Sequence, residues 1–309
     1  MERNNNSKLS IYIVTGFLGS GKTSFLKHYT EELLKRDEKI AVIMNEFGDF
    51  DVDSQILKPV IQTISLQNGC VCCDLSQALV AQLSVIINQN QAQHVIIEAT
   101  GIAHPLQLIE ACFDPVLANH VNPPQVIGLV DAPRFLQRHE YSDSTQQLME
   151  EQIEVSHDII VNKIDLINDE EQNEVKLQLK ALNPHGILLP ATYGQVDFTD
   201  LKQKDSSDKP HSHSHLHHHG ISSLAYTFTA PIDRQMFYQF ILRLPENIYR
   251  LKGYIRFRDT PETTYLFQFA YGMPDYEPIQ GNNTNTVVLI GENLDKERLR
   301  NQLDALQFT

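Results

Sequence analysis

The sequence predicts an α/β fold in which a mostly parallel, doubly wound sheet precedes a smaller α+β domain. Short apolar, β-branched segments alternate with helix-like segments along residues 1–205, and this alternation is typical of a parallel sheet covered by helices. The apolar segments are nearly continuous, as expected for strands that are buried on both faces. After residue 220 the pattern changes, because several strand-like segments follow one another between helical ones.

Each predicted element has its own sequence signal. Buried strands of the first domain are expected at Ile11–Thr15, Lys39–Met44, His94–Glu98, Val126–Val130, Asp158–Val161 and Gly186–Leu189. Helical patterns cover Thr23–Lys35, Leu75–Ile87, Gln146–Val155 and Glu170–Leu182. In the second domain we expect strands at Ser222–Thr229, Ile248–Arg258, Thr263–Ala270 and Thr286–Ile290. Its two helices are one capped by Asp233 that ends before Pro245, and one over Leu294–Leu306.

A polar, histidine-rich segment separates the two predicted domains. Residues 202–220 read KQKDSSDKPHSHSHLHHHG and have no apolar periodicity, so they predict a flexible linker. We therefore place the first domain at residues 1–205, the linker at 206–220 and the second domain at 221–309.

Composition narrows the class of protein. The chain has 25 Lys and Arg against 39 Asp and Glu, a net charge of −14, and so lacks the basic surface that nucleic-acid binding requires. No leader-like N-terminal segment is present, and no apolar run approaches the ~18 residues that span a membrane. Three of the four cysteines fall within four residues, which indicates metal or redox chemistry in a reducing compartment. We expect a cytoplasmic protein with no nucleic-acid or membrane partner.

The segment Gly16–Thr23, GFLGSGKT, fits the phosphate-loop pattern GxxxxGK[ST] between a predicted strand and a predicted helix. Glycines let backbone N–H groups turn toward phosphate oxygens at the helix N-terminus. Lys22 is expected to reach the β- and γ-phosphates, and the Thr23 hydroxyl to ligate Mg²⁺. The predicted nucleotide-binding residues here are Gly16, Gly19, Ser20, Gly21, Lys22, Thr23 and Ser24.

A second segment favours GTP over ATP. Asn162, Lys163 and Asp165 form an NKxD sequence at the end of a predicted strand. A carboxylate there accepts hydrogen bonds from the N1–H and N2–H₂ groups of guanine, whereas adenine has no such pair of donors.

The sequence EATG closes the predicted strand His94–Glu98. Glu98 is expected either to hold Mg²⁺ through water or to orient the attacking water, and the Gly101 amide to contact the γ-phosphate. The alternative for Glu98 is a surface carboxylate at a strand end. With Lys22, these two residues are the predicted catalytic set.

Three thiols form the predicted metal site. Gly69 and Asp74, the latter as a helix N-cap, indicate a turn that lets Cys70, Cys72 and Cys73 converge. Thiols at a helix N-terminus have a lowered pKa and bind Zn²⁺ or a similar ion, with a fourth position left open. Buried structural thiols, a structural metal site and a redox pair remain alternatives. Cys112 stands alone and is expected in the core.

Together, GFLGSGKT, NEFGDFDVD at Asn45–Asp53, GCVCCDL, IIEATG, NKID, the His-rich linker and the smaller C-terminal domain resemble the CobW-type metallochaperone GTPases, relatives of UreG and HypB. The resemblance covers nearly the whole chain. It implies a P-loop GTPase whose CxCC site binds Zn²⁺ or a neighbouring divalent ion, with GTP favouring metal capture and hydrolysis favouring release. Two departures are small: EATG replaces the more common ETTG, and the linker has fewer histidines than the richest members.

The resemblance also assigns roles to individual segments. Asn45–Asp53 is expected to be switch I, with Glu46 and Asp49 as ligands of Mg²⁺ or of the fourth metal position, or as solvated loop acids. The sequence Tyr249–Gly253, YRLKG, matches a C-terminal strand of the family, and either packing against the GTPase domain or partner binding is open for it.

The linker histidines form a possible auxiliary metal site. Six of the thirteen histidines fall within nine residues: His211, His213, His215, His217, His218 and His219. Such density on a flexible segment favours weak, rapidly exchanging metal binding. A polar spacer or a purification-tag remnant is the alternative.

These features predict a GTP-hydrolysing metallochaperone that carries Zn(II), or Co(II) or Ni(II), to a client metalloprotein, with a homodimer as a candidate assembly. The alternative is a GTP-binding metal buffer or sensor without productive transfer. A small-molecule kinase is disfavoured, because NKID selects guanine.

Overall fold

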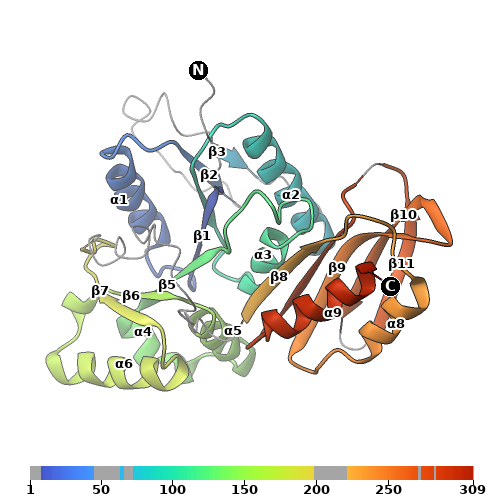
Figure 1. The fold of residues 1–309 in the computed structure, drawn as a ribbon. Coiled ribbons are helices and arrows are strands. Elements are labelled where there is room, and N and C mark those ends of the chain that lie inside the picture. Colours follow the sequence, from blue (N-terminus) through green and yellow to red (C-terminus); the bar gives the residue numbers. More distant parts are fainter. Residues whose placement is uncertain are drawn as a thin grey trace. The chain divides into compact units, whose positions relative to one another are not determined.

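The computed structural model describes residues 8–44, 63–65, 72–197, 221–270, 273–281 and 283–308. These residues divide into two compact units, shown in Figure 1. The first contains the described residues up to 109 together with 124–197, and the second contains 110–123 together with 221–308. The linker predicted at 206–220 lies outside the described residues, so the proposed domain boundaries stay a prediction.

The first unit is built on a parallel sheet. Its strands, in the described part of the chain, are β1 (Ser10–Thr15), β2 (Ile40–Met44), β3 (Thr63–Ser65), β4 (His94–Glu98), β5 (Gln125–Asp131), β6 (Asp158–Asn162) and β7 (Ile187–Pro190). They pair in the order β3-β2-β4-β1-β5-β6-β7, and every pairing is parallel. The predicted parallel sheet is confirmed. The strand β3 was not predicted, because three residues are too short to show a pattern.

Helices cover both faces of this sheet. They include α1 (Lys22–Leu34), α2 (Cys72–Asn88), α4 (Ala132–Leu136), α5 (Asp143–Glu154) and α6 (Asp169–Leu182), with short 3₁₀ turns η1 (Arg138–Glu140) and η2 (Ile164–Leu166). The helix α3 (Pro105–Cys112) begins in this unit and ends in the second. Residues of α1 pack in one core cluster with Leu129 of β5, whereas residues of α4, α5 and α6 pack in another with Val130. Neighbouring strand residues point to opposite faces, so the sheet is doubly wound as predicted.

Several details differ from the predicted helices. The helix α2 begins at Cys72, so Asp74 is its third residue and the expectation that Asp74 caps it is wrong. The short helices α3 and α4 were not predicted, because five to eight residues carry too little periodicity. A capping box between Asn168 and Glu171 begins α6 one residue before the predicted start.

The second unit is an antiparallel sheet with helices on one face (Figure 1). Its strands β8 (Ile221–Thr227), β9 (Ile248–Phe257), β10 (Thr260–Ala270), β11 (Met273–Ile279) and β12 (Thr286–Glu292) pair in the order β11-β10-β9-β12-β8. The helices are α8 (Arg234–Leu242) and α9 (Lys296–Phe308). Asp233 caps α8 by accepting a hydrogen bond from the Met236 N–H at 2.8 Å, as predicted.

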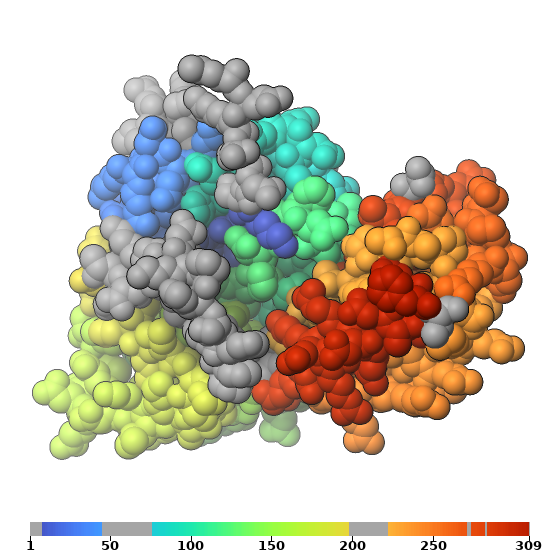
Figure 2. Space-filling model, viewed as in Figure 1, coloured from blue at the N-terminus to red at the C-terminus, as the bar shows by residue number. Residues whose placement is uncertain are grey.

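The core of this unit is aromatic, and one strand lies outside it. Phe237 of α8, Phe267 of β10 and Leu303 of α9 are fully buried together, while the outer side of α9 lies at the surface in Figure 2. The edge strand β11 was not predicted, because nearly all of its residues are exposed and two are prolines.

The YRLKG segment of β9 packs within the second unit. Arg250 pairs with Glu110, and Lys252 Nζ lies 2.5 Å from the Asp114 carboxylate. Both acids belong to residues 110–123, which the sequence analysis had assigned to the first domain. These ion pairs favour a packing role for Arg250 and Lys252.

Among the described residues, the search for a helix long and apolar enough to cross a membrane finds none.

A buried amide joins the elements around β6. The Asn183 side chain is fully buried, and its Nδ2 donates to the Ile153 and Ser156 carbonyls at 2.9 and 2.8 Å. Its Oδ1 accepts a hydrogen bond from the Gly186 N–H at 2.5 Å. The end of α5, the end of α6 and the start of β7 are therefore held by one side chain.

We expect Asn183→Ala to lower the free energy of unfolding by about 3 kcal/mol, because the Ser156 carbonyl and the Gly186 N–H lose their partner and the Ile153 carbonyl keeps only backbone N–H donors. Asn168→Ala, which removes only the helix cap of α6, should cost about 1 kcal/mol. Urea unfolding followed by circular dichroism measures both. Equal losses for the two variants would show that Asn183 is no more than a local cap.

Candidate nucleotide-binding site

The phosphate-loop sequence forms a tight turn between β1 and α1. Its three glycines, Gly16, Gly19 and Gly21, have φ angles of 142°, 76° and 101°. Residues with side chains rarely adopt this left-handed region, so the glycine spacing is needed for the backbone to turn. The resulting loop ends at the N-terminus of α1, where backbone N–H groups favour an anion.

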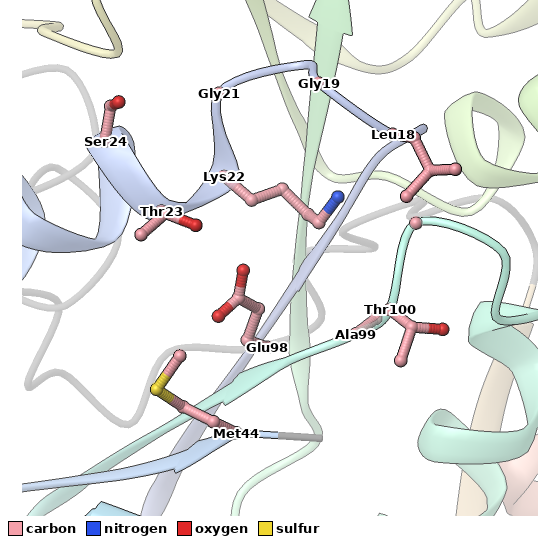
Figure 3. Close-up of a pocket in the computed structure, with 11 residues that line it drawn as sticks. Leu18, Gly19, Gly21, Lys22, Thr23, Ser24, Met44, Glu98, Ala99 and Thr100 are labelled. Atoms are coloured by element: carbon pink, nitrogen blue, oxygen red, sulfur yellow. The ribbon is translucent and has the colours of Figure 1, made fainter. Parts of the chain in front are cut away.

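A cavity of about 390 Å³ lies under this loop (Figure 3). It is lined by Leu18, Gly19, Gly21, Lys22, Thr23, Ser24, Met44, Glu98, Ala99, Thr100 and Gly101. Lys22 is 9% exposed, and its Nζ donates to the Gly16 carbonyl at 2.8 Å. The structure thus brings the loop residues, the end of β2 and the end of β4 around one cavity with a buried cation.

The segment after β4 lies directly against the phosphate loop. A Cβ atom on Gly101 would lie 2.8 Å from the Leu18 nitrogen and 2.7 Å from the Leu18 Cδ2, so only glycine fits. In Figure 3 the Glu98 carboxylate points into the cavity, toward the part of the loop that carries Lys22 and Thr23. This orientation disfavours the alternative of a plain surface carboxylate for Glu98.

The NKID segment is hydrogen-bonded to the same loop. Asn162, 1% exposed, donates from Nδ2 to the Ser20 carbonyl at 2.8 Å. Lys163, in a left-handed conformation with φ 61°, donates from Nζ to the Gly19 carbonyl at 2.9 Å. Asp165 is exposed on η2. The two sequence segments that predict phosphate and guanine binding are therefore neighbours in the fold.

Sequence reasoning missed three groups beside this site. The Gly194 N–H, in the turn after β7, donates to Asn162 Oδ1 at 2.9 Å. Gln152 of α5 is 2% exposed and donates to the Gly101 and Ala103 carbonyls at 3.3 Å. Asp131, 7% exposed at the end of β5, accepts from Lys163 at 2.6 Å. The sequence ATYG after a predicted strand is a detectable turn signal, whereas nothing local marks Asp131 or Gln152.

These groups fit a nucleotide phosphate with Mg²⁺. The loop supplies a cation in Lys22 and hydroxyls in Thr23 and Ser24 at the cavity wall, and Glu98 supplies a carboxylate. The buried Oγ atoms of Thr15 and Ser20 have no hydrogen-bond partner among the described residues. A polar ligand is expected for a loop of this composition.

The predicted transition-metal site falls largely outside the described residues. Cys70, the acids Glu46 and Asp49, and the histidine tract at 211–219 are not described, and for Cys72 and Cys73 only their place at the start of α2 is described. The described part of the chain contains no group of three or more His, Cys, Asp or Glu side chains that could hold a metal ion.

The fourth cysteine is a core residue, as predicted. Cys112 has no exposed surface, and burial raises the pKa of its thiol to about 12. The thiol is therefore protonated at neutral pH and is a poor metal ligand or nucleophile.

Two domain families match this chain in sequence. Residues 10–190 match the family described as CobW/HypB/UreG, nucleotide-binding domain. Residues 221–307 match the family described as cobalamin synthesis protein cobW C-terminal domain. The two matches cover most of the chain and contain the loop, the EATG segment, the NKID segment and the antiparallel sheet.

Several characterised proteins are similar to this chain. The zinc-regulated GTPase metalloprotein activator 1 of Dictyostelium discoideum is 24% identical, over 85% of this chain and 66% of its own length. The zinc chaperone YjiA of Escherichia coli is 29% identical, over 94% of this chain and 96% of its own. The zinc chaperone CobW of a Sinorhizobium species is 31% identical, with 54% of each chain covered. The chain therefore spans about two thirds of the length of the Dictyostelium relative and about half of the length of the Sinorhizobium relative.

A solved structure is also similar to this chain. The Zn(II)-bound YjiA GTPase of E. coli is 24% identical, with 97% of this chain and 99% of the other covered and a TM-score of 0.49.

Since the family match at residues 10–190 covers more than half of the sequence, the chain belongs to the CobW/HypB/UreG family of P-loop GTPases.

Proposed function

We propose that this protein hydrolyses GTP and couples its nucleotide state to the capture and delivery of a transition metal, Zn(II) or else Co(II) or Ni(II), to a client metalloprotein. The observation that best supports the nucleotide part of this proposal is the pair of hydrogen bonds from Asn162 and Lys163 of the NKID segment to the phosphate loop. The names of the relatives, which include zinc chaperones and a zinc-regulated GTPase activator, support the metal half.

In this proposal the chain's own groups stabilise the transferred phosphoryl. Lys22 and the loop N–H groups oppose its negative charge, Thr23 holds Mg²⁺, and the Gly101 N–H contacts the γ-phosphate. Glu98 holds Mg²⁺ through water or orients the attacking water. Mg²⁺ supplies further neutralisation of phosphate charge when it is bound.

The position of the thiol segment relative to the sheet supports coupling. Ser65 at the end of β3 is the register partner of Met44, and Met44 lines the nucleotide cavity. The six residues between Ser65 and Cys72 connect that same edge of the sheet to the N-terminus of α2. A helix N-terminus lowers the pKa of nearby thiols, which favours metal binding by Cys70, Cys72 and Cys73. Glu46 and the linker histidines are auxiliary ligands in this proposal.

A metal buffer or sensor with GTP as a regulatory ligand is the second candidate. The density of thiols and histidines favours it, since six histidines and three cysteines bind metal without any turnover of GTP. Negligible GTP hydrolysis, with metal and with a client protein present, distinguishes this candidate from the first.

We expect the affinity for Zn²⁺ to rise at least about tenfold when a non-hydrolysable GTP analogue and Mg²⁺ replace GDP and Mg²⁺. The measurement is a competition titration of Zn²⁺ and Co²⁺ against a chromophoric chelator, with no nucleotide, with GDP and with the analogue. A Cys72→Ser/Cys73→Ser variant should lose the tight site, whereas the matched control Cys112→Ala should keep it. Equal affinity in the three nucleotide states would favour the buffer.

We expect Asp165→Asn to weaken GTP binding by roughly 100-fold and to improve binding of XTP, because an amide presents one donor and one acceptor where the carboxylate presents two acceptors. Calorimetric titration of both nucleotides measures this change. Asp169→Asn, the same substitution at an exposed residue of α6, is the control and should bind GTP normally. Unchanged GTP affinity in Asp165→Asn would exclude Asp165 from guanine recognition.

The high pKa and burial of Cys112 predict that at most three of the four thiols of the native, metal-free protein react with an aromatic disulfide reagent at pH 7. The remaining thiol should react only after unfolding in guanidinium, and Cys112→Ala should show the same count before and after unfolding. Reaction of four thiols in the native protein would contradict this prediction.

A further inference from the structure

We propose that Arg134 is a positioning residue for the nucleotide phosphates, acting on the phosphate loop from behind together with Asp131 and Lys163. This inference rests on the proposed nucleotide site but concerns Arg134 and Asp131, which lie outside its sequence motifs. It follows from the hydrogen bonds on the carbonyl side of the loop, from the place of the guanidinium, and from the geometry of the peptide that it holds.

Side chains hold every carbonyl from Gly16 to Ser20. Lys22 Nζ donates to the Gly16 and Phe17 carbonyls at 2.8 and 3.3 Å. Lys163 and Asn162 donate to the Gly19 and Ser20 carbonyls. The carbonyl between these two pairs belongs to Leu18, and Arg134 Nη1 donates to it at 2.8 Å. Arg134 is the one donor in this set that belongs to neither GFLGSGKT nor NKID.

Arg134 reaches the loop from the side opposite the nucleotide cavity. A Cβ atom on Gly19 would lie 2.8 Å from Arg134 Nη1 and 3.4 Å from its Cζ, so the guanidinium lies against the Gly19 backbone. Arg134 and Asp131 line a small cavity behind Gly16 and Phe17, and neither is among the residues that line the nucleotide cavity. The guanidinium therefore contacts the loop from outside the nucleotide cavity.

One buried carboxylate, that of Asp131, contacts the side chains of both Lys163 and Arg134. Asp131 Oδ2 accepts from Lys163 Nζ at 2.6 Å and lies 3.7 Å from Arg134 Nε. Asp131 Oδ1 accepts from the Arg134 backbone N–H at 3.2 Å, which caps α4. Since Asp131 ends the interior strand β5, the position of both cations is set by the sheet.

The bond to Leu18 sets the direction of the next N–H group. The Leu18 carbonyl and the Gly19 N–H belong to one trans peptide, in which the two groups point in opposite directions. Holding the carbonyl outward turns the Gly19 N–H toward the side of the loop where Gly19 lines the nucleotide cavity. A cation on the carbonyl also polarises the peptide and strengthens the N–H as a donor. Arg134 thereby prepares an N–H group for a phosphate oxygen before the nucleotide arrives.

The experiment compares Arg134→Ala, Arg134→Lys and Arg138→Ala by calorimetric titration with GDP, IDP and a non-hydrolysable GTP analogue, each with Mg²⁺. Arg138 is the matched control, because its Cζ lies 4.2 Å from the centre of the Phe135 ring and it donates to Gln178 and the Phe135 carbonyl instead of to the loop. Thermal unfolding of the ligand-free variants shows whether each has folded normally.

We expect Arg134→Ala to weaken binding of all three nucleotides by roughly tenfold, because one charge-assisted hydrogen bond to the loop is lost. The ratio of GDP to IDP affinity should not change, since the base contacts stay in place. Arg134→Lys should recover most of the affinity, and Arg138→Ala should bind as the wild type does.

Three outcomes would overturn the proposal: unchanged affinity in Arg134→Ala, an equal loss in Arg138→Ala, or a changed ratio of GDP to IDP affinity. The last would point to the guanine side through Lys163. In all three cases the wild-type protein still binds GDP, so the proposed function survives. A wild-type protein that binds none of the nucleotides overturns both.

Discussion

Hydrogen bonds to the carbonyl side of the phosphate loop are the constraint on which the nucleotide site depends. A loop that presents several N–H groups to an anion must turn its carbonyls the other way, where donors from other elements can hold them. Here the donors come from Lys22 on α1, Asn162 and Lys163 at the end of β6, and Arg134 on α4. The loop is therefore shaped by three elements that meet behind it, and its glycines allow the backbone to follow.

The parallel sheet explains why these elements meet. The ends of β1, β4, β5, β6 and β7 lie at one edge of the sheet, and each carries part of the site. The segments after β2 and β3 leave from the same edge, and they hold the predicted switch and the thiols. The proposed coupling between nucleotide and metal therefore depends on this one edge of the sheet.

Contact between the phosphate loop and the segment after β4 is a second consequence of this packing. Leu18 is held by Arg134 at its carbonyl, and it leaves no room for a side chain at Gly101. Gln152 holds the carbonyls of Gly101 and Ala103 from α5. If nucleotide binding shifts the segment after β4, the phosphate loop and α5 must shift with it, because these parts are close-packed.

The sequence by itself determined the features that depend on nearby residues. The GFLGSGKT and NKID segments, the parallel arrangement of apolar strands, the cap of α8 and the burial of Cys112 all follow from local patterns. The strands β3 and β11 were not predicted, because β3 is short and β11 is an exposed edge strand. Only the tertiary structure decided that Arg134 contacts Leu18, 116 residues away, and that Asp131 joins Arg134 to Lys163. Such contacts leave no local signal, since their geometry exists only once the strands have paired.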